Sequence, residues 1–229
     1  MRYGSPLSRG VMIERVASVL ADVRLDSGEI VTAYCPNMTR MMGLAPAGGD
    51  VFLSFDDSPY RRVRYTVEAV GVNGTLVGVD LDAQAALAAE AVESGVFDGL
   101  DGYDAVGPAP DPSVCDLELT GARRIPCRIA VLPVYEKRAT SLFFPDGIET
   151  ANRLVLRELD GCLDAGYRAV LIVLAQRNDC LAVRADPAAD PVFVGLLKNL
   201  CDKGLEIIAC GCSVSLEEIR ITALLPFMF

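Results

Sequence analysis

The sequence contains no histidine among its 229 residues. Catalytic groups of the Ser-His-Asp and Cys-His kinds need an imidazole that accepts and returns a proton. Zinc sites of the Cys2His2 kind need the same ring as a ligand. The composition therefore excludes all three kinds of site.

The chain also lacks a long hydrophobic run. No apolar stretch reaches the ~20 residues that a membrane-spanning helix requires, and the chain opens with Arg2 and Tyr3 rather than with a signal peptide. We therefore expect a cytoplasmic protein with no membrane partner. Hydrophobic residues make up 52% of the chain and charged residues 23%, which is enough to build a full core, with two modest domains expected.

Positive charge is scarce. The chain has 21 lysine and arginine residues against 31 aspartate and glutamate residues, so its formal net charge is -10. A surface of this sign repels the phosphate backbone of nucleic acids. Binding to DNA or RNA would therefore need a local basic patch. The oligomeric state leaves no signal in the composition.

Cysteine is abundant, with eight residues. In a reducing compartment such thiols pack as small hydrophobic groups, and five of the eight have apolar neighbours. Those five are Cys115, Cys127, Cys162, Cys180 and Cys201. The close pair Cys210 and Cys212 lacks a second pair at metal-site spacing, so no zinc site is predicted.

The first eighty residues have the pattern of an all-β domain. Segments rich in Val, Leu, Tyr and Thr alternate with turn residues, and the turns at Asp26-Ser27-Gly28 and Asn73-Gly74 are typical of hairpins. The expected strands cover residues 16–25, 29–35, 51–55, 63–72 and 75–81. Five strands at this spacing favour a small barrel of the oligonucleotide/oligosaccharide-binding (OB) type, with a β-sandwich as the alternative.

From Asp82 the pattern changes to strands that alternate with helices. We expect helices at 82–94, with Asp82 as the cap, at 147–165 and at 190–203, and a loop at 95–112. The expected strands cover 115–119, 127–134, 168–175 and 205–210. This order predicts an α/β sheet with crossover connections. The predicted domains are residues 1–81 and 82–229.

Four segments resemble the sugar fermentation stimulation protein A family at corresponding spacings. They are PLSRGVMIER at 6–15, CPNMTRM at 35–41, FPD at 144–146 and KGLEI at 203–207. The resemblance implies an OB-like barrel followed by a restriction-endonuclease-like α/β domain of the PD-(D/E)xK class. It also implies an association with DNA and a regulatory role in sugar metabolism.

The resemblance also implies where catalytic residues would stand. Asp116 matches the family's aspartate, but the family's E-V-K segment reads Ala130-Val131-Leu132 here. The second acid and the lysine of a metal-dependent nuclease are thus replaced by apolar residues. A lone carboxylate holds Mg²⁺ poorly. We therefore expect a degenerate site, no nuclease activity and no resident cofactor.

A rebuilt site is the alternative. Glu118 lies two residues after Asp116, so both side chains would face the same side of a strand and could hold Mg²⁺ together. Glu136 and Lys137 could supply a displaced acid and base. The protein would then be a divergent metal-dependent nuclease. In the competing interpretation these charges are solvated.

The densest basic cluster consists of Arg61, Arg62 and Arg64 and lies in the expected barrel. Arginines that follow a phosphate backbone beside an aromatic ring that stacks on bases are typical of single-strand binding by such barrels. The candidate residues are Arg15, Asn37, Arg40, Arg61, Arg62, Arg64 and Tyr65. The alternative is a charged edge strand that deters aggregation. We predict weak binding without sequence preference, or an acidic scaffold that no longer binds DNA.

Overall fold

A computed structural model of the chain describes residues 1–17, 19–36, 44, 46–111 and 115–229. The chain forms two compact units. The first combines Met1–Ala83 with Gln176–Asp179 and Cys212–Arg220, and the second contains the rest of the chain. Two segments from the C-terminal half therefore join the first unit. The division of the chain into domains at 1–81 and 82–229 stays a prediction.

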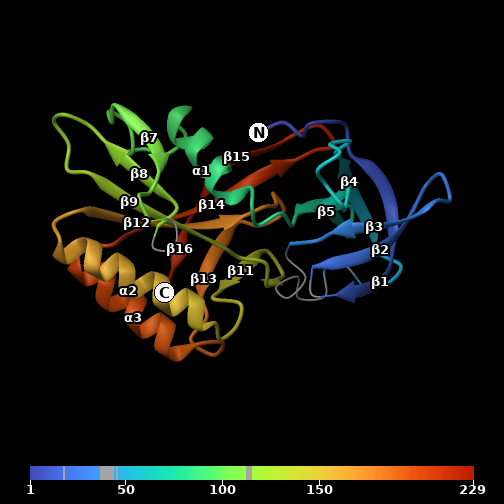
Figure 1. The fold of residues 1–229 in the computed structure, drawn as a ribbon. Helices are drawn as coiled ribbons and strands as arrows, with labels where there is room; N and C mark the ends of the chain where they lie inside the picture. The colour runs from blue at the N-terminus through green and yellow to red at the C-terminus, as the bar shows by residue number, and fades with distance from the viewer. Residues whose placement is uncertain (18, 37–43, 45, 112–114) are drawn as a thin grey trace. The chain divides into compact units, whose positions relative to one another are not determined.

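The first unit is a small β-barrel (Figure 1). Its strands follow the order β3-β2-β1-β4-β5-β6, and a further pairing of β3 with β5 closes five of them into a barrel. The strands are β1 (Ser8–Ala17), β2 (Leu20–Leu25), β3 (Ile30–Tyr34), β4 (Asp50–Phe55), β5 (Tyr65–Val72) and β6 (Thr75–Gly78). This arrangement confirms the predicted OB-type barrel.

Alternating side chains fill the barrel. On β2, Ala21 and Val23 are buried, and the residues between them face outward. The hairpin turns need positive φ angles, which Gly28 (φ 89), Asn73 (φ 50) and Gly74 (φ 80) supply. Both turns were predicted, because glycine and asparagine adopt this conformation more readily than other residues.

One predicted strand was wrong. The segment 16–25 combines the end of β1 with all of β2, and these two strands pair in antiparallel fashion with Ala17 opposite Leu20. The turn between them contains no glycine, asparagine or proline, so the sequence reads as one continuous strand. The true β1 starts at Ser8, within a segment that was not assigned to a strand.

The second unit contains a six-stranded sheet in the order β15-β14-β12-β9-β8-β7. Its strands are β7 (Ala105–Pro108), β8 (Leu117–Thr120), β9 (Cys127–Pro133), β12 (Arg168–Ala175), β14 (Glu206–Val214) and β15 (Ile219–Leu225). The strands β9, β12 and β14 are parallel, as crossover connections require. The mixed α/β architecture was predicted. The loop predicted at 95–112 was partly wrong, because it contains β7.

A second, four-stranded sheet has the order β10-β11-β13-β16. Its strands are β10 (Lys137–Arg138), β11 (Ser141–Phe144), β13 (Ala182–Ala185) and β16 (Phe227–Met228). None of them was predicted. Strands of two to four residues are too short to show a two-residue periodicity.

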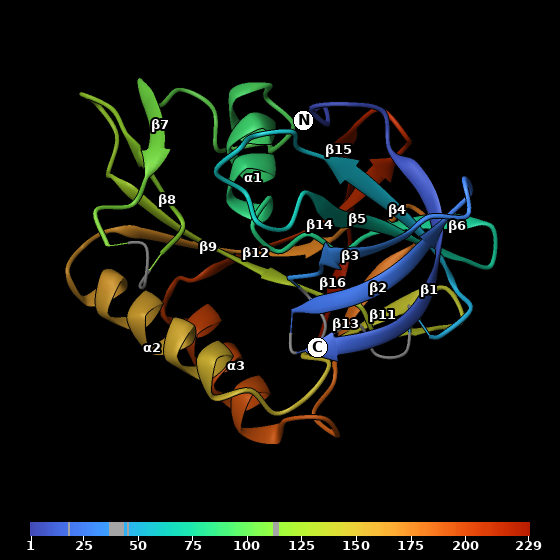
Figure 2. The same ribbon diagram turned by 45° about the vertical axis from the view of Figure 1, so that its right-hand side comes forward.

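The described part of the second unit contains the helices α1 (Gln84–Glu93), α2 (Thr150–Asp164) and α3 (Pro191–Lys203). Helices α2 and α3 lie side by side, and α2 packs on β9 and β12 (Figure 2). The predicted cap of α1 at Asp82 stays a prediction, and Asp80 accepts hydrogen bonds from the amides of residues 82 and 83, which precede the helix.

Asp190 fixes the start of α3. Its Oδ1 accepts a hydrogen bond from the Phe193 amide at 2.9 Å, and both carboxylate oxygens accept from Arg153 of α2 at 2.9 and 2.7 Å. Asp190 is only 1% exposed. Its hydrogen bonds with Arg153 lower the pKa of Asp190 below its ordinary range. One carboxylate thus caps α3 and joins it to α2.

We predict that Asp190→Asn makes unfolding easier at neutral pH. The amide still accepts from Phe193 but no longer pairs with the Arg153 cation. A carboxyl whose pKa is lowered by folding stabilises the protein above its unfolded pKa, and this stability is lost as the pH falls through the folded pKa. In urea unfolding, the difference from the parent should therefore be largest from pH 5 to 7 and shrink below about pH 4.

The matched control is Asp160→Asn. Asp160 pairs with Lys203 on the exposed side of the same two helices, and such surface pairs contribute little. A pH-independent difference for Asp190→Asn would contradict the prediction.

Candidate functional site

Asp116 lies directly before β8 and is tied to β9 by two hydrogen bonds. Its amide donates to the Ile129 carbonyl at 2.9 Å, and its Oδ2 accepts from the Val131 amide at 2.7 Å. Burial raises the pKa of Asp116, while the hydrogen bond from Val131 acts in the opposite direction. The structure therefore brings Asp116 to the middle of the Ala130-Val131-Leu132 segment.

The two residues that flank Val131 are closed off from solvent. Ala130 is 2% exposed and Leu132 is 7% exposed. Both belong to the same buried cluster as Leu156 and Leu159 of α2. A carboxylate or an ammonium group at these positions would lose its hydration without a charged partner, which is costly. The face of β9 on which Ala130 and Leu132 lie is therefore part of the hydrophobic core.

Glu118 is engaged in an ion pair. It lies opposite Arg128 in the pairing of β8 with β9, and the Arg128 Nη2 is 3.0 Å from the Glu118 Oε1. The Arg128 guanidinium in turn lies over the Tyr167 ring, 4.8 Å from its centre. A metal ion held by Glu118 would have to displace this arginine.

Lys137 lies in β10, where it pairs with Leu142 in the four-stranded sheet. Asp116 lies beside the six-stranded sheet, so the two residues of the alternative site belong to different sheets. Across the described ranges, no group of three or more histidine, cysteine, aspartate or glutamate side chains is arranged to hold a metal ion.

In the barrel, Arg61 is surrounded by acids. Its Nε lies 3.6 Å from the Asp56 Oδ2, and its Nη1 is 3.5 Å from the Thr66 Oγ1. Burial raises the pKa values of Glu68 and Asp80, and the positive charge of Arg61 opposes both shifts. Much of the charge of Arg61 is therefore balanced within the protein.

Arg62 and Arg64 are exposed, and aromatic rings lie close to them in the chain. Tyr65 begins β5, and the centre of its ring is 5.0 Å from that of Phe55 at the end of β4. Phe55 is 42% exposed and Tyr60 is 94% exposed. Sequence reasoning missed Phe55 and Tyr60, although both precede the arginines within a few residues. We call Phe55, Tyr60 and Tyr65 the aromatic group.

The remaining nucleic-acid candidates do not extend this patch. Arg15 is exposed on β1, which β4 separates from β5 in the strand order. Asn37 and Arg40 lie outside the described residues. The described basic residues beside the aromatic group are therefore Arg61, Arg62 and Arg64.

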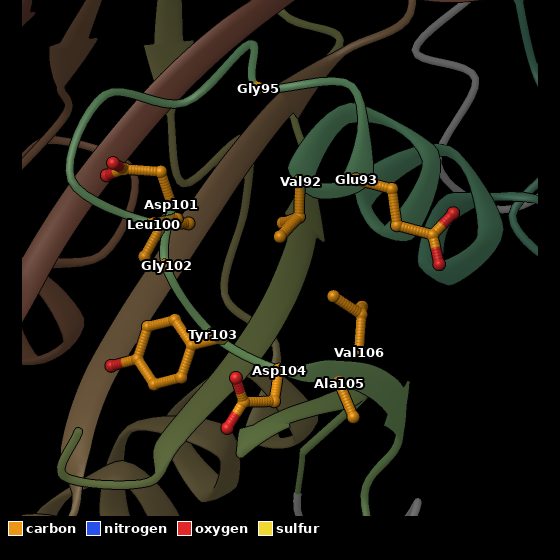
Figure 3. Close-up of a pocket in the computed structure, with 10 residues that line it drawn as sticks. All are labelled: Val92, Glu93, Gly95, Leu100, Asp101, Gly102, Tyr103, Asp104, Ala105 and Val106. Carbon is orange, nitrogen blue, oxygen red and sulfur yellow. The ribbon is translucent and has the colours of Figure 1, made fainter. Parts of the chain in front are cut away.

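The second unit has a hollow of about 520 Å³ beside the end of α1 and the start of β7 (Figure 3). Three of its lining residues are acids: Glu93, Asp101 and Asp104. The Asp104 Oδ2 accepts from the Ala122 amide at 2.8 Å, so this acid also holds a turn. Lining carboxylates repel phosphate groups, so this hollow does not suit nucleic acid.

Within the described residues, no helix is both long enough and apolar enough to cross a bilayer.

Comparisons with known proteins agree with this architecture. Residues 13–79 match the model of the SfsA N-terminal OB domain, and residues 82–218 match that of the sugar fermentation stimulation protein RE domain. The solved structure of Pyrococcus furiosus SfsA in complex with Ca²⁺ has a TM-score of 0.87 over 99% of both chains. With 19% sequence identity, this likeness concerns the fold alone.

Curated relatives cover the whole chain. The sugar fermentation stimulation protein homolog of Maricaulis maris is 37% identical over 225 residues, which is 96% of each chain. The homolog of Geobacter sulfurreducens is 38% identical over 226 residues, which is 97% of each chain. With both domain models matched in order and relatives of this similarity along its full length, the chain belongs to the sugar fermentation stimulation protein (SfsA) family.

Proposed function

We propose that this protein is a nonenzymatic regulatory member of the SfsA family that associates weakly with single-stranded nucleic acid. The barrel makes the contact, and the second unit is a nuclease-like domain of the PD-(D/E)xK class without its chemistry. The burial of Ala130 and Leu132 beside Asp116 carries this proposal. The link to sugar fermentation comes from the names of the relatives.

The loss of chemistry follows from what a metal-dependent nuclease needs. The metal must be fixed by more than one carboxylate, and a cation must stabilise the charge that develops on the phosphate. Asp116 already accepts a hydrogen bond from Val131, and Glu118 is paired with Arg128. The two positions that flank Val131 supply only hydrocarbon. This leaves no pair of carboxylates ready to hold the ion.

The case for single strands rests on the aromatic group beside the exposed arginines. Bases of any sequence stack on aromatic rings, and arginines attract the phosphates that connect them. The net charge of -10 opposes this attraction, and the charge of Arg61 is partly used by Asp56. Binding should therefore be weak, indifferent to sequence and steeply reduced by salt.

We predict that the purified protein does not cut DNA or RNA in the presence of Mg²⁺ or Mn²⁺, because Ala130 and Leu132 occupy the described positions beside Asp116 where the chemistry would need an acid and a lysine. The assay follows labelled single-stranded and duplex substrates on denaturing gels. Asp98→Ala, which changes an exposed acid elsewhere in the second unit, controls for contaminating nucleases. Cleavage that persists in Asp98→Ala and disappears in Asp116→Ala would establish the divergent nuclease instead.

A second prediction concerns the role of Asp116 in stability. Asp116→Ala leaves the Val131 amide without its acceptor, which should cost about 1–3 kcal/mol of unfolding free energy. Asp116→Asn keeps an acceptor oxygen and should stay near the parent. Because burial raises the pKa of the Asp116 carboxyl, the charged form is disfavoured in the folded protein. The stability of Asp116→Asn relative to the parent should therefore increase as the pH rises through that pKa. Urea unfolding measures both effects.

The same variants test for a metal site. Addition of Mg²⁺ should leave the midpoint of thermal unfolding unchanged in the parent and in Asp116→Asn alike, since a ligand of the folded state would raise it. A rise that occurs in the parent alone would contradict the structural role of Asp116.

A third prediction concerns binding. Replacing Arg62 and Arg64 together by alanine should weaken binding to every oligonucleotide alike. For single strands, the slope of log K against the logarithm of the salt concentration should become shallower by about 1.4. Tyr60→Ala should weaken binding to single strands more than to duplexes, since only unpaired bases stack freely on the ring. Fluorescence anisotropy at low salt measures both effects. Arg61→Ala should have a smaller effect, because Asp56 already neutralises this arginine.

Arg157→Ala is the matched control, since it removes an exposed arginine from α2 in the second unit. If the parent shows no binding at low salt, the acidic-scaffold interpretation replaces the proposal. Equal losses in Arg157→Ala and in the double variant would place the binding outside the barrel.

A further inference from the structure

Two free thiols meet between the start of β8 and helix α2. Cys115 directly precedes Asp116 and is 2% exposed, within the buried cluster that includes Leu159 of α2. Cys162 follows Leu159 by three residues, on the same side of that helix, and packs against the same cluster. Both residues are free cysteines. The fold thus brings together two cysteines that are far apart in the sequence.

A second contact supports this proximity. The Cys115 amide donates to the Asp111 carbonyl at 3.3 Å. Asp111 and Cys162 both line a hollow of about 240 Å³. The two thiols lie within hydrogen-bonding reach of each other, and burial together with the nearby Cys162 raises the pKa of Cys115 to about 12.

Access to the two sulfur atoms differs. Cys162 is partly exposed and faces the hollow, whose lining also includes Arg128, Glu158 and Tyr167. A small oxidant that enters the hollow meets Cys162 before it meets Cys115.

We propose that Cys115 and Cys162 form a redox modification site, in which a peroxide converts the two thiols into a disulfide that fastens the start of β8 to α2. The Cys162 sulfur first attacks the peroxide, breaks its O–O bond and becomes a sulfenic acid, with release of water from hydrogen peroxide. The Cys115 sulfur then attacks the Cys162 sulfur, its proton leaves with the hydroxyl group as a second water, and the S–S bond forms. The two thiols lose two electrons, and the peroxide gains them.

This site does not depend on nucleic-acid binding by the barrel. Its consequence concerns the second unit, because the new bond would hold the residue before Asp116 against α2. Cross-linking these two elements restricts the unfolded chain and should stabilise the folded unit.

The sequence makes the test direct. Trypsin cuts after Arg64 and Arg123 and after Arg157 and Arg168, so each of the two thiols is the only cysteine in its own peptide. The full-length protein is treated with hydrogen peroxide, remaining thiols are blocked with N-ethylmaleimide, and the digest is analysed by mass spectrometry without reduction. We expect a linked pair of the peptides 65–123 and 158–168 that separates on reduction. Circular dichroism confirms that the treated protein is folded.

The variants separate the two steps. Cys115→Ala should leave a sulfenic acid at Cys162 that dimedone traps, whereas Cys162→Ala should abolish the link and leave Cys115 unmodified. Cys201→Ala, which removes a partly exposed cysteine of α3, is the matched control and should still form the link. In the parent and the control, oxidation should raise the midpoint of thermal unfolding. This rise should be absent in Cys115→Ala and Cys162→Ala.

The parent alone can overturn the proposal, even where a variant fails to fold. Oxidised, folded parent that contains no 65–123 to 158–168 link, or that links Cys162 to other cysteines as often, would refute it. A lower unfolding midpoint after the link has formed would refute the fastening of β8 to α2.

Discussion

The second unit depends on the placement of β9, which hydrogen-bonds to β8 on one side and to β12 on the other and lies beneath α2. A strand with neighbours on both edges and a helix on one face must bury the side chains on that face. Ala130 and Leu132 meet this requirement with hydrocarbon. Any charged group there would have to be paired with another charge or remain at the edge of the sheet.

The same constraint explains how Asp116 is held. Its carboxylate lies beside the backbone of β9 and accepts a hydrogen bond from the Val131 amide. Asp116 thus satisfies a main-chain donor of β9 next to the start of β8. Further along the two strands, Glu118 and Arg128 pair across the ladder, and Arg128 stacks on Tyr167. Asp116, Glu118 and Arg128 thus have structural partners. Under the proposed function, the second unit keeps its architecture without binding an ion.

Charge distribution limits the barrel in a similar way. Asp56, Glu68 and Asp80 surround Arg61, and the overall charge repels polyanions at long range. Arg62 and Arg64 are exposed and lie close in the chain to Phe55, Tyr60 and Tyr65, the group proposed to bind single strands. Contacts with single strands would therefore be local, and the rest of the molecule would weaken them.

The sequence by itself determined the barrel and the mixed α/β architecture, whereas the replacement of a catalytic acid and lysine by Ala130 and Leu132 stays a prediction. Turn residues such as Gly28 and Asn73, the switch of periodicity near residue 82 and the parallel apolar strand β12 are local signals, because the conformations of neighbouring residues produce them. The strands β7, β10, β11, β13 and β16 were missed, since pairing with distant partners stabilises segments too short to show a pattern. The glycine-free turn between β1 and β2 was missed because it leaves no local mark.

Only the tertiary structure decided which side chains meet. Sequence spacing suggested that Glu118 and Asp116 could share an ion, but the ladder places Arg128 opposite Glu118. It also suggested Lys137 as a replacement base, although a different sheet contains this residue. The meeting of Cys115 with Cys162 and the exposure of Phe55 and Tyr60 beside the arginines were equally hidden. Such contacts depend on the long-range packing of strands and helices, which brings together residues that carry no information about each other in the sequence.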